Sequence, residues 1–141
     1  PVYAAFYDDE VTRGFLHSHS YTGNPLACRA ALATLAIFAE DDVLNANRQR
    51  AAYLNENATE LKSQPWLRHW RQRGMIWAFD VDTAIKQFPL RVFKAGLRHD
   101  LLLRPIGNTV YFMPPYVIDE KETDFLLRQT LTVLNEALAD G

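Results

Sequence analysis

Apolar residues along the chain follow two kinds of pattern, and each predicts one kind of element. Where they recur every three or four positions, a helix packed on one face is expected; short apolar or alternating runs are typical of strands. The first pattern predicts helices at Pro25–Glu40, Val43–Ser63, Ala84–Arg98 and Asp119–Gly141. The second predicts strands at Val2–Tyr7, Met75–Val81, Leu101–Arg104 and Thr109–Met113. A helical turn near Asp9–Phe15 and a polar loop at His17–Gly23 complete an α+β layer, a small sheet covered by helices.

The predicted helices carry start signals. Asn24 is a good N-cap residue, and Pro25 suits the first helical position, where its missing N–H costs nothing. Asp119 and Glu122 have the spacing of a capping box. Pro89 must lie in the first turn of its helix or divide that helix.

Three predicted elements have an apolar side that would face a common core. The helix at 43–63, the strand at 75–81 and the last helix each place apolar residues on one face. These residues are Leu44, Ala51, Leu54, Ala58 and Leu61; Trp77, Phe79 and Val81; and Leu127, Leu131, Leu134 and Leu138. The helix at 25–40 differs, because its many small residues indicate close packing on another element.

Composition and charge narrow the function classes. The chain has 141 residues, of which 48% are hydrophobic and 23% charged, as in an ordinary globular domain. A net charge of -2 argues against nucleic acid or an anionic membrane as the main partner. The basic run Arg68–Arg73 is interpreted as a solvated turn around a packed Trp70 and not as an RNA-binding patch.

The single cysteine and the first residues bear on the chain's origin. Cys28 can form neither an internal disulfide nor a zinc pattern, so a reducing compartment, by default the cytoplasm, is expected. The sequence shows no apolar run near 18 residues and no signal peptide. It opens at Pro1 without a methionine, directly in a predicted strand, which is expected of an excised or truncated piece; a processed N-terminus explains the same start.

The loop before the helix at 25–40 is rich in hydrogen-bonding groups. Ser18, Ser20, Tyr21 and Thr22 offer hydroxyls, and the helix offers N–H groups and the positive end of its dipole. This combination suits an anion, most simply a phosphate, although ordinary helix capping explains the same residues. His17 and His19 lie two apart without a third ligand nearby, so no metal site is expected.

A second candidate site is Leu101–Tyr116. Arg104 ends an apolar run and precedes Pro105, where a guanidinium can clamp a carboxylate in a bidentate pair. A structural ion pair with an internal Asp or Glu explains the same arginine. Tyr111 and Tyr116 either line this cleft or simply pack. None of the four lysines has the desolvated setting of a Schiff-base lysine, so no catalytic residue is predicted.

Two motifs together resemble a known family. The segment "HSHSYTGNPLACRAALATL" is similar to the stretch after the catalytic lysine in class III, pyridoxal-phosphate-dependent aminotransferases. The segment "RPIGNTVYFMPPYVI" resembles the branch of that family that acts in biotin biosynthesis. The resemblance implies the C-terminal portion of a fold-type-I enzyme, α/β in class when complete. Residues 1–23 would be the tail of the large domain with its phosphate loop, and residues 24–141 the small domain.

The resemblance also implies roles for particular residues. Ser20 stands where the family bonds the phosphate of pyridoxal 5'-phosphate in the neighbouring subunit of a homodimer, and His19 would contribute through its backbone. Ser18 would lie at the substrate edge, Arg104 would hold the substrate carboxylate, and Tyr111 would lie near that pocket. The family's Schiff-base lysine, its aspartate and its stacking aromatic are expected upstream of Pro1. The 141 residues alone are therefore expected to be inactive.

The reaction implied by the branch moves an amino group from S-adenosylmethionine to 8-amino-7-oxononanoate, with small molecules as its only other partners. Two alternatives stay open at this point. One is another class III transaminase of the ω-amino acid:pyruvate type. The other is a stand-alone assembly module without catalytic function.

Overall fold

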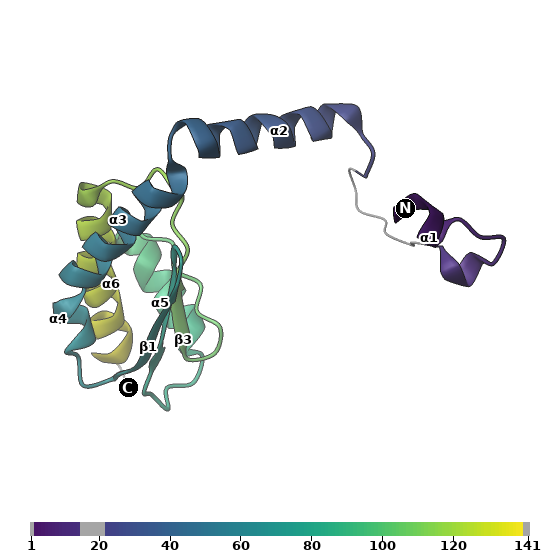
Figure 1. The fold of residues 1–141 in the computed structure, drawn as a ribbon. Helices are drawn as coiled ribbons and strands as arrows, with labels where there is room; N and C mark the ends of the chain where they lie inside the picture. The colour runs from purple at the N-terminus through teal and green to yellow at the C-terminus, as the bar shows by residue number, and fades with distance from the viewer. Residues whose placement is uncertain (1, 15–21, 140–141) are drawn as a thin grey trace. The chain divides into compact units, whose positions relative to one another are not determined.

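The computed structural model describes residues 2–14 and 22–139 (Figure 1). The chain divides into two compact units, Pro1–Glu40 and Asp41–Gly141, and each is described by itself. Because this division concerns the isolated chain, the expected boundary between residues 23 and 24 of a complete enzyme stays a prediction. Within the described ranges, no helix is long and apolar enough to cross a membrane.

The described part of the first unit, residues 2–14 and 22–40, contains α1 (Val2–Phe6), the 3-10 helix η1 (Val11–Arg13) and α2 (Pro25–Glu40). The strand predicted at Val2–Tyr7 is wrong, because this segment is α1. A helix satisfies its own backbone hydrogen bonds, whereas a strand needs a neighbour, and the sheet of the described residues is built entirely between residues 67 and 112. The rings of Tyr3 and Tyr7, one helical turn apart, stack with centroids 5.3 Å apart.

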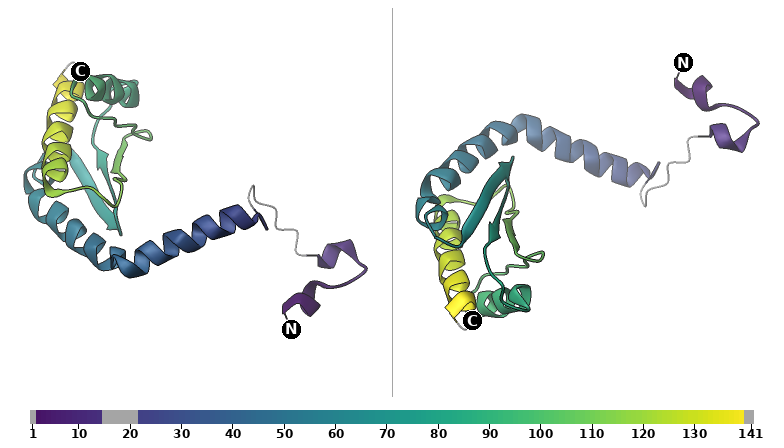
Figure 2. Two further views of the ribbon diagram at one scale, coloured as in Figure 1. Left: turned by 90° about the horizontal axis from the view of Figure 1, so that it is seen from above. Right: turned by 90° about the horizontal axis from the view of Figure 1, so that it is seen from below.

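The second unit is a layer of helices on a small antiparallel sheet, so the predicted α+β arrangement is correct. Its elements, in chain order, are α3 (Val43–Asn57), α4 (Thr59–Lys62), β1 (Leu67–Arg73), β2 (Ile76–Val81), α5 (Phe88–Arg98), β3 (Thr109–Phe112) and α6 (Glu120–Ala139). The sheet has three strands in the order β1-β2-β3, so β1 and β3 are its edges. Helices α3 and α6 lie side by side on one side of this sheet (Figures 1 and 2).

The core lies between the sheet and these helices. On β2, Trp77, Phe79 and Val81 point inward and are at most 2% exposed, as the alternating pattern predicts. The indole N–H of Trp77 donates to the side-chain oxygen of Asn55 on α3 at 3.1 Å, so its polar edge is satisfied. Trp70 packs on this core by stacking on Phe79.

Helix starts agree with their predicted caps. The Asn24 side-chain oxygen accepts the N–H groups of Leu26 and Ala27 at 2.9 and 3.2 Å. Asp119 and Glu122 form a reciprocal capping box, with backbone-to-carboxylate distances of 2.8 and 3.0 Å. Pro89 lies in the first turn of α5.

Three further predictions need correction. The run Arg68–Arg73 is part of β1 and not a turn; a bulge between Arg68 and Arg71, with His69 at φ +53°, breaks the alternation that marks a strand. Leu101–Arg104 is an extended connection without strand pairing, although Leu103 is buried. The helix predicted at 43–63 is interrupted at Ala58, and Leu44 is exposed, unlike the other members of its predicted face.

The end of α5 explains why the connection at 101–104 leaves the helix so tightly. Leu101 donates its backbone N–H to the carbonyl of Gly96 at 2.9 Å. A Cβ at position 96 would lie 2.4 Å from the carbonyl oxygen of Leu101, so only glycine permits this approach. The chain is thereby turned from α5 into the segment that carries Arg104.

Candidate functional site

A tight turn carries the second candidate site. The backbone N–H of Ile106 donates to the Thr109 carbonyl at 2.9 Å, and the N–H of Thr109 donates to the Ile106 carbonyl at 3.0 Å. Gly107, in the turn itself, has φ +57°, a left-handed conformation that favours glycine. The predicted "PIGN" turn is therefore present. Its first limb carries Arg104 and its second limb, strand β3, carries Tyr111.

Arg104 and Tyr111 line the same pocket. This pocket has a volume of about 260 Å³ and lies where the end of β3 and the 102–104 segment approach α6. Its apolar wall is formed by Leu102, Leu103, Phe112, Met113, Pro114 and Leu126. An apolar wall with one cation and one phenol in the same lining suits a molecule that has a hydrocarbon chain and a carboxylate.

Arg104 has no hydrogen-bond or ion-pair partner among the described residues. Its side chain is exposed, whereas the preceding Leu103 is buried and fixes the backbone next to it. The structural ion pair that explains a lone arginine equally well is thus not formed within residues 2–14 and 22–139. The role predicted for Arg104, to bind a substrate carboxylate, stays a prediction at this point.

Tyr116 does not join Arg104. It lines a separate pocket with α3 and the β1–β2 turn, so of the two tyrosines only Tyr111 lies at the arginine. The stiff Met113–Pro115 segment separates them, because proline restricts its own φ and the residue before it. The two tyrosines were expected either to line the cleft of Arg104 or simply to pack. Tyr111 lines this cleft, whereas Tyr116 lines a different pocket.

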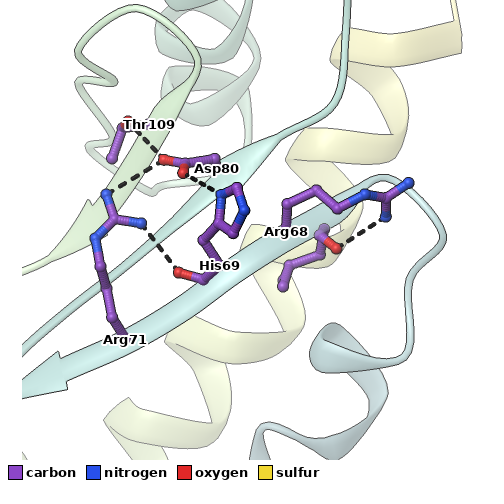
Figure 3. A network of polar contacts seen from close by, with 6 residues as sticks. Arg68, His69, Arg71, Asp80 and Thr109 are labelled. Carbon is purple, nitrogen blue, oxygen red and sulfur yellow. Dashed lines mark hydrogen bonds and ion pairs between the residues drawn. The ribbon is translucent and has the colours of Figure 1, made fainter.

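A polar network on the sheet face opposite the core was not predicted. The Asp80 carboxylate on β2 accepts the Thr109 hydroxyl at 2.7 Å, contacts Nδ1 of His69 at 2.9 Å and pairs with Arg71 at 3.2 Å (Figure 3). Arg71 also donates to the backbone carbonyl of His69 at 3.0 Å. One carboxylate therefore contacts all three strands of the sheet.

These contacts act on the ionisation of Asp80. The hydrogen bond from Thr109, then that from His69, lowers the pKa of Asp80 from its ordinary value of 3.8 to about 2, against a smaller opposing effect of burial. A signal for this network is present in the sequence. Asp80 and Thr109 are directly opposite in register, and both occupy the non-core positions of alternating strands. The contact between Asp80 and Thr109 becomes predictable only once β2 is aligned with β3 in the correct register.

The phosphate-loop prediction lies mostly outside the described residues. Ser18, His19, Ser20 and Tyr21 fall in the range 15–21, so their predicted roles are untested. At the start of α2, Asn24 already takes the N–H groups of Leu26 and Ala27 through its side chain, and its carbonyl accepts the N–H of Cys28 at 2.9 Å. The first turn of α2 is thus capped from within, and an anion here would depend on the hydroxyls that precede Asn24.

Other candidate groups have structural settings. Among the described residues, no group of three or more His, Cys, Asp or Glu side chains is arranged to hold a metal ion. Lys62 is partly buried, which lowers its pKa; it donates to the Asn55 carbonyl at 2.7 Å and lies over the Trp70 ring. It is therefore less solvated than its helical-surface sequence context indicates, and it serves packing.

Comparison with known proteins identifies the class. The family Aminotransferase class-III matches residues 1–137, and the chain belongs to this family. The resemblance of its motifs is thereby confirmed.

Individual relatives give a finer comparison. An adenosylmethionine-8-amino-7-oxononanoate aminotransferase of Helicobacter pylori is 40% identical over 141 residues, covering 96% of this chain and 32% of the relative. An acetylornithine aminotransferase of Synechocystis sp. is 33% identical, covering 87% of this chain and 28% of the relative. The chain spans about a third of the length of the curated relatives that it matches.

A solved structure supports the same grouping. The crystal structure of adenosylmethionine-8-amino-7-oxononanoate aminotransferase from Methanocaldococcus jannaschii superimposes with a TM-score of 0.80 at 28% identity. The match covers 97% of this chain and 34% of that chain. The predicted fold class, part of a fold-type-I aminotransferase with a small sheet packed by helices, is confirmed.

Proposed function

We propose that this chain is part of an aminotransferase that moves an amino group from S-adenosylmethionine to 8-amino-7-oxononanoate, giving 7,8-diaminononanoate. The single observation that carries the proposal is the shared pocket of Arg104 and Tyr111 with its apolar wall. The acceptor of this reaction has a carboxylate at the end of a hydrocarbon chain, which matches a cation in the lining of an apolar cleft. The names of similar enzymes support the same reaction.

In this proposal each residue of the pocket has a role in binding. Arg104 pairs with the acceptor carboxylate through two parallel hydrogen bonds. Tyr111 closes one side of the cleft and orients the chain of the acceptor, while Leu103 and Phe112 exclude water from its methylene groups. The amino donor is held by the same region, and Ser18 contributes at the substrate edge.

The cofactor in this proposal is pyridoxal 5'-phosphate, which, when bound, is the electron sink that carries the amino group between substrates. The residue types suit its phosphate: Ser20 would offer a hydroxyl and His19 its backbone, and Thr22, two positions after Ser20 in the sequence, is exposed. These residues hold the phosphate bound in the neighbouring subunit of a homodimer. Residues of the remaining protein supply the covalent attachment, so the 141 residues alone do not transaminate.

The main test uses the full-length protein that contains this segment. Arg104→Ala should weaken acceptor binding by about 2–5 kcal/mol, the cost of truncating one partner of a desolvated charge pair. Arg73→Ala, an exposed arginine at the end of β1 that lines none of the pockets described, is the matched control. Steady-state kinetics with each substrate measure the effect. Unchanged acceptor kinetics in Arg104→Ala contradict the assigned role.

Two further measurements separate the proposed reaction from related ones. S-adenosylmethionine should serve as the amino donor, and pyruvate should not be needed as acceptor; efficient use of pyruvate instead indicates an ω-amino acid transaminase. Ser20→Ala should weaken cofactor binding by about 1.5–3 kcal/mol, the value of one hydrogen bond to a charged group. A cofactor dissociation constant equal to that of the wild type returns Ser20 to a capping role.

A further inference from the structure

Asp80 and Thr109 connect the sheet to the pocket of Arg104 and Tyr111. The two pocket residues flank the turn closed by Ile106 and Thr109. Arg104 lies two residues before Ile106, and Tyr111 lies two residues after Thr109. A displacement of this turn moves both side chains together. The position of the turn relative to β2 therefore bears on two residues of the pocket lining.

The turn is attached to the end of β2 at three points. The N–H of Val81 donates to the Asn108 carbonyl at 2.9 Å, and the Asn108 side chain donates to the Thr83 carbonyl at 2.9 Å. The third point is the hydrogen bond from the Thr109 hydroxyl to Asp80 at 2.7 Å. Of these three hydrogen bonds, only this one has a charged acceptor, the Asp80 carboxylate. Charge-assisted hydrogen bonds are shorter and stronger than neutral ones.

Among the residues that the structure describes, strand β3 pairs with β2 alone, because it lies at the edge of the sheet. Asp80 supplies a connection beyond this one neighbour, since it is itself held by His69 and Arg71 on β1 (Figure 3). The bulge on β1 places His69 in a left-handed conformation, which is strained for a residue with a side chain. His69 contacts the Asp80 carboxylate, and so does Thr109. The Asp80 carboxylate therefore contacts both the bulge on β1 and the turn before β3.

We propose that Asp80 is a positioning residue for the Arg104–Tyr111 pocket, acting through the Thr109 hydroxyl on the turn that carries both side chains. This inference deepens the proposed function and rests on it. Neither Asp80 nor Thr109 lines the pocket, so their effect on substrate is indirect. A merely structural carboxylate would stabilise the β1–β2 pair without changing acceptor binding.

Thr109→Val in the full-length protein with bound pyridoxal phosphate separates these two roles. Valine keeps the shape of the side chain and leaves the contacts of Asp80 with His69 and Arg71 intact, while the hydrogen bond to the turn is lost. The KM for 8-amino-7-oxononanoate should rise about tenfold, the loss expected for one hydrogen bond to a charged group. The kcat should stay within about twofold, because chemistry at saturation does not use this contact.

Thr109→Ser is the rescue variant, since serine restores the hydroxyl and should return the KM to near the wild-type value. Arg68→Ala is the matched control: it removes the ion pair between Arg68 on β1 and Asp82, the residue after β2, and does not touch Thr109 or Asp80. Its KM should equal that of the wild type. A rise in KM for Thr109→Val that serine does not reverse overturns the inference, as does an unchanged KM.

Amide hydrogen exchange of residues 101–112 gives a readout that is independent of the substrate. Exchange in this segment should be faster in Thr109→Val than in wild type and Thr109→Ser. If the wild-type enzyme does not accept 8-amino-7-oxononanoate, the proposed function fails, while faster exchange in Thr109→Val still supports the positioning role. Exchange identical in all three proteins overturns the positioning role, whatever the substrate.

Discussion

Helix α2 is more apolar than α6, yet α6 is the one that is buried. Six residues of α6 are buried, among them Leu127, Val133 and Leu134, whereas α2 has none. On α2, Leu26, Leu32, Leu35 and Ile37 are all more than half exposed. The two helices also differ in patterning: α6 has one apolar face and one polar face, while α2 is apolar nearly all round.

The comparison separates a unit with its own core from one without. Residues 41–141 bury their apolar faces against each other, around Trp77 and Phe79. Residues 1–40 have helices but no buried residue in any of them. A helix that is apolar on most sides is typical of one covered on several sides in a larger protein. The stability of the 141-residue chain should therefore reside in its second unit.

The largest expected effect comes from one leucine in each unit. Leu134→Ala should lower the free energy of unfolding by about 2–5 kcal/mol, because a fully buried side chain leaves a cavity. Leu35→Ala in α2, which is 65% exposed, should change it by less than about 0.5 kcal/mol. Urea unfolding followed by circular dichroism measures both. Equal losses in the two variants would break the comparison.

The two helix caps provide a second contrast. Asp119→Ala removes one half of the capping box of α6 and should cost about 1 kcal/mol of global stability. Asn24→Ala removes a comparable cap from α2 and should reduce helical content without shifting the main unfolding transition. Far-ultraviolet circular dichroism of the native state reports the loss of helix. A shift of the main transition by Asn24→Ala would mean that α2 unfolds together with the second unit.

Two threonines of α6 sharpen the account of the second unit. The Thr130 hydroxyl is buried without a partner among the described residues, whereas Thr123 donates to the Asp119 carbonyl at 2.8 Å. Thr130→Val should therefore stabilise the chain by about 1 kcal/mol, and Thr123→Val should destabilise it by a similar amount. Calorimetric melting temperatures distinguish the two signs. A loss of stability in Thr130→Val would indicate that its hydroxyl has an unseen partner.

The smallest expected effect concerns acid. Since the folded-state pKa of Asp80 is depressed to about 2 from an ordinary 3.8, its contribution is complete above pH 3.8 and is lost as the pH falls toward 2. The wild type should thus lose more stability than Asp80→Asn between about pH 5 and about pH 2, an interval that runs from above the ordinary pKa down to the folded-state value. Urea midpoints at both pH values measure the difference. Asp82→Asn controls for the removal of one carboxylate nearby, and parallel losses in wild type and Asp80→Asn contradict the depressed pKa.

Local signals predicted two helix caps, one in each unit, and much of the core of the second unit. Caps at Asn24 and Asp119 and the inward residues of β2 were readable because each depends on neighbours within a few positions. β1 was missed because the bulge at His69 shifts the register, and the alternating pattern is lost. The strand predicted at Val2–Tyr7 failed for another reason: an apolar run does not state whether a partner strand is present.

The candidate site also contains residues that the sequence predicts and one that it does not. Arg104 and Tyr111 were recognised as candidates from their motif, and the structure adds their common pocket. Asp80 was not recognised, because its partners lie on two other strands and become neighbours only after the sheet is paired. Residue type and spacing thus predict groups that face a ligand more readily than the groups that position them.

The stacking of Trp70 on Phe79 has a practical consequence for spectroscopy. All three tryptophans of the chain, Trp66, Trp70 and Trp77, lie within the second unit, two of them against its core and one inside it. Intrinsic tryptophan fluorescence therefore reports on residues 41–141 and carries no signal from a tryptophan in residues 1–40. A fluorescent probe attached at the exposed Cys28 on α2 would report on residues 1–40 at a different wavelength. The two units of one molecule can then be followed separately.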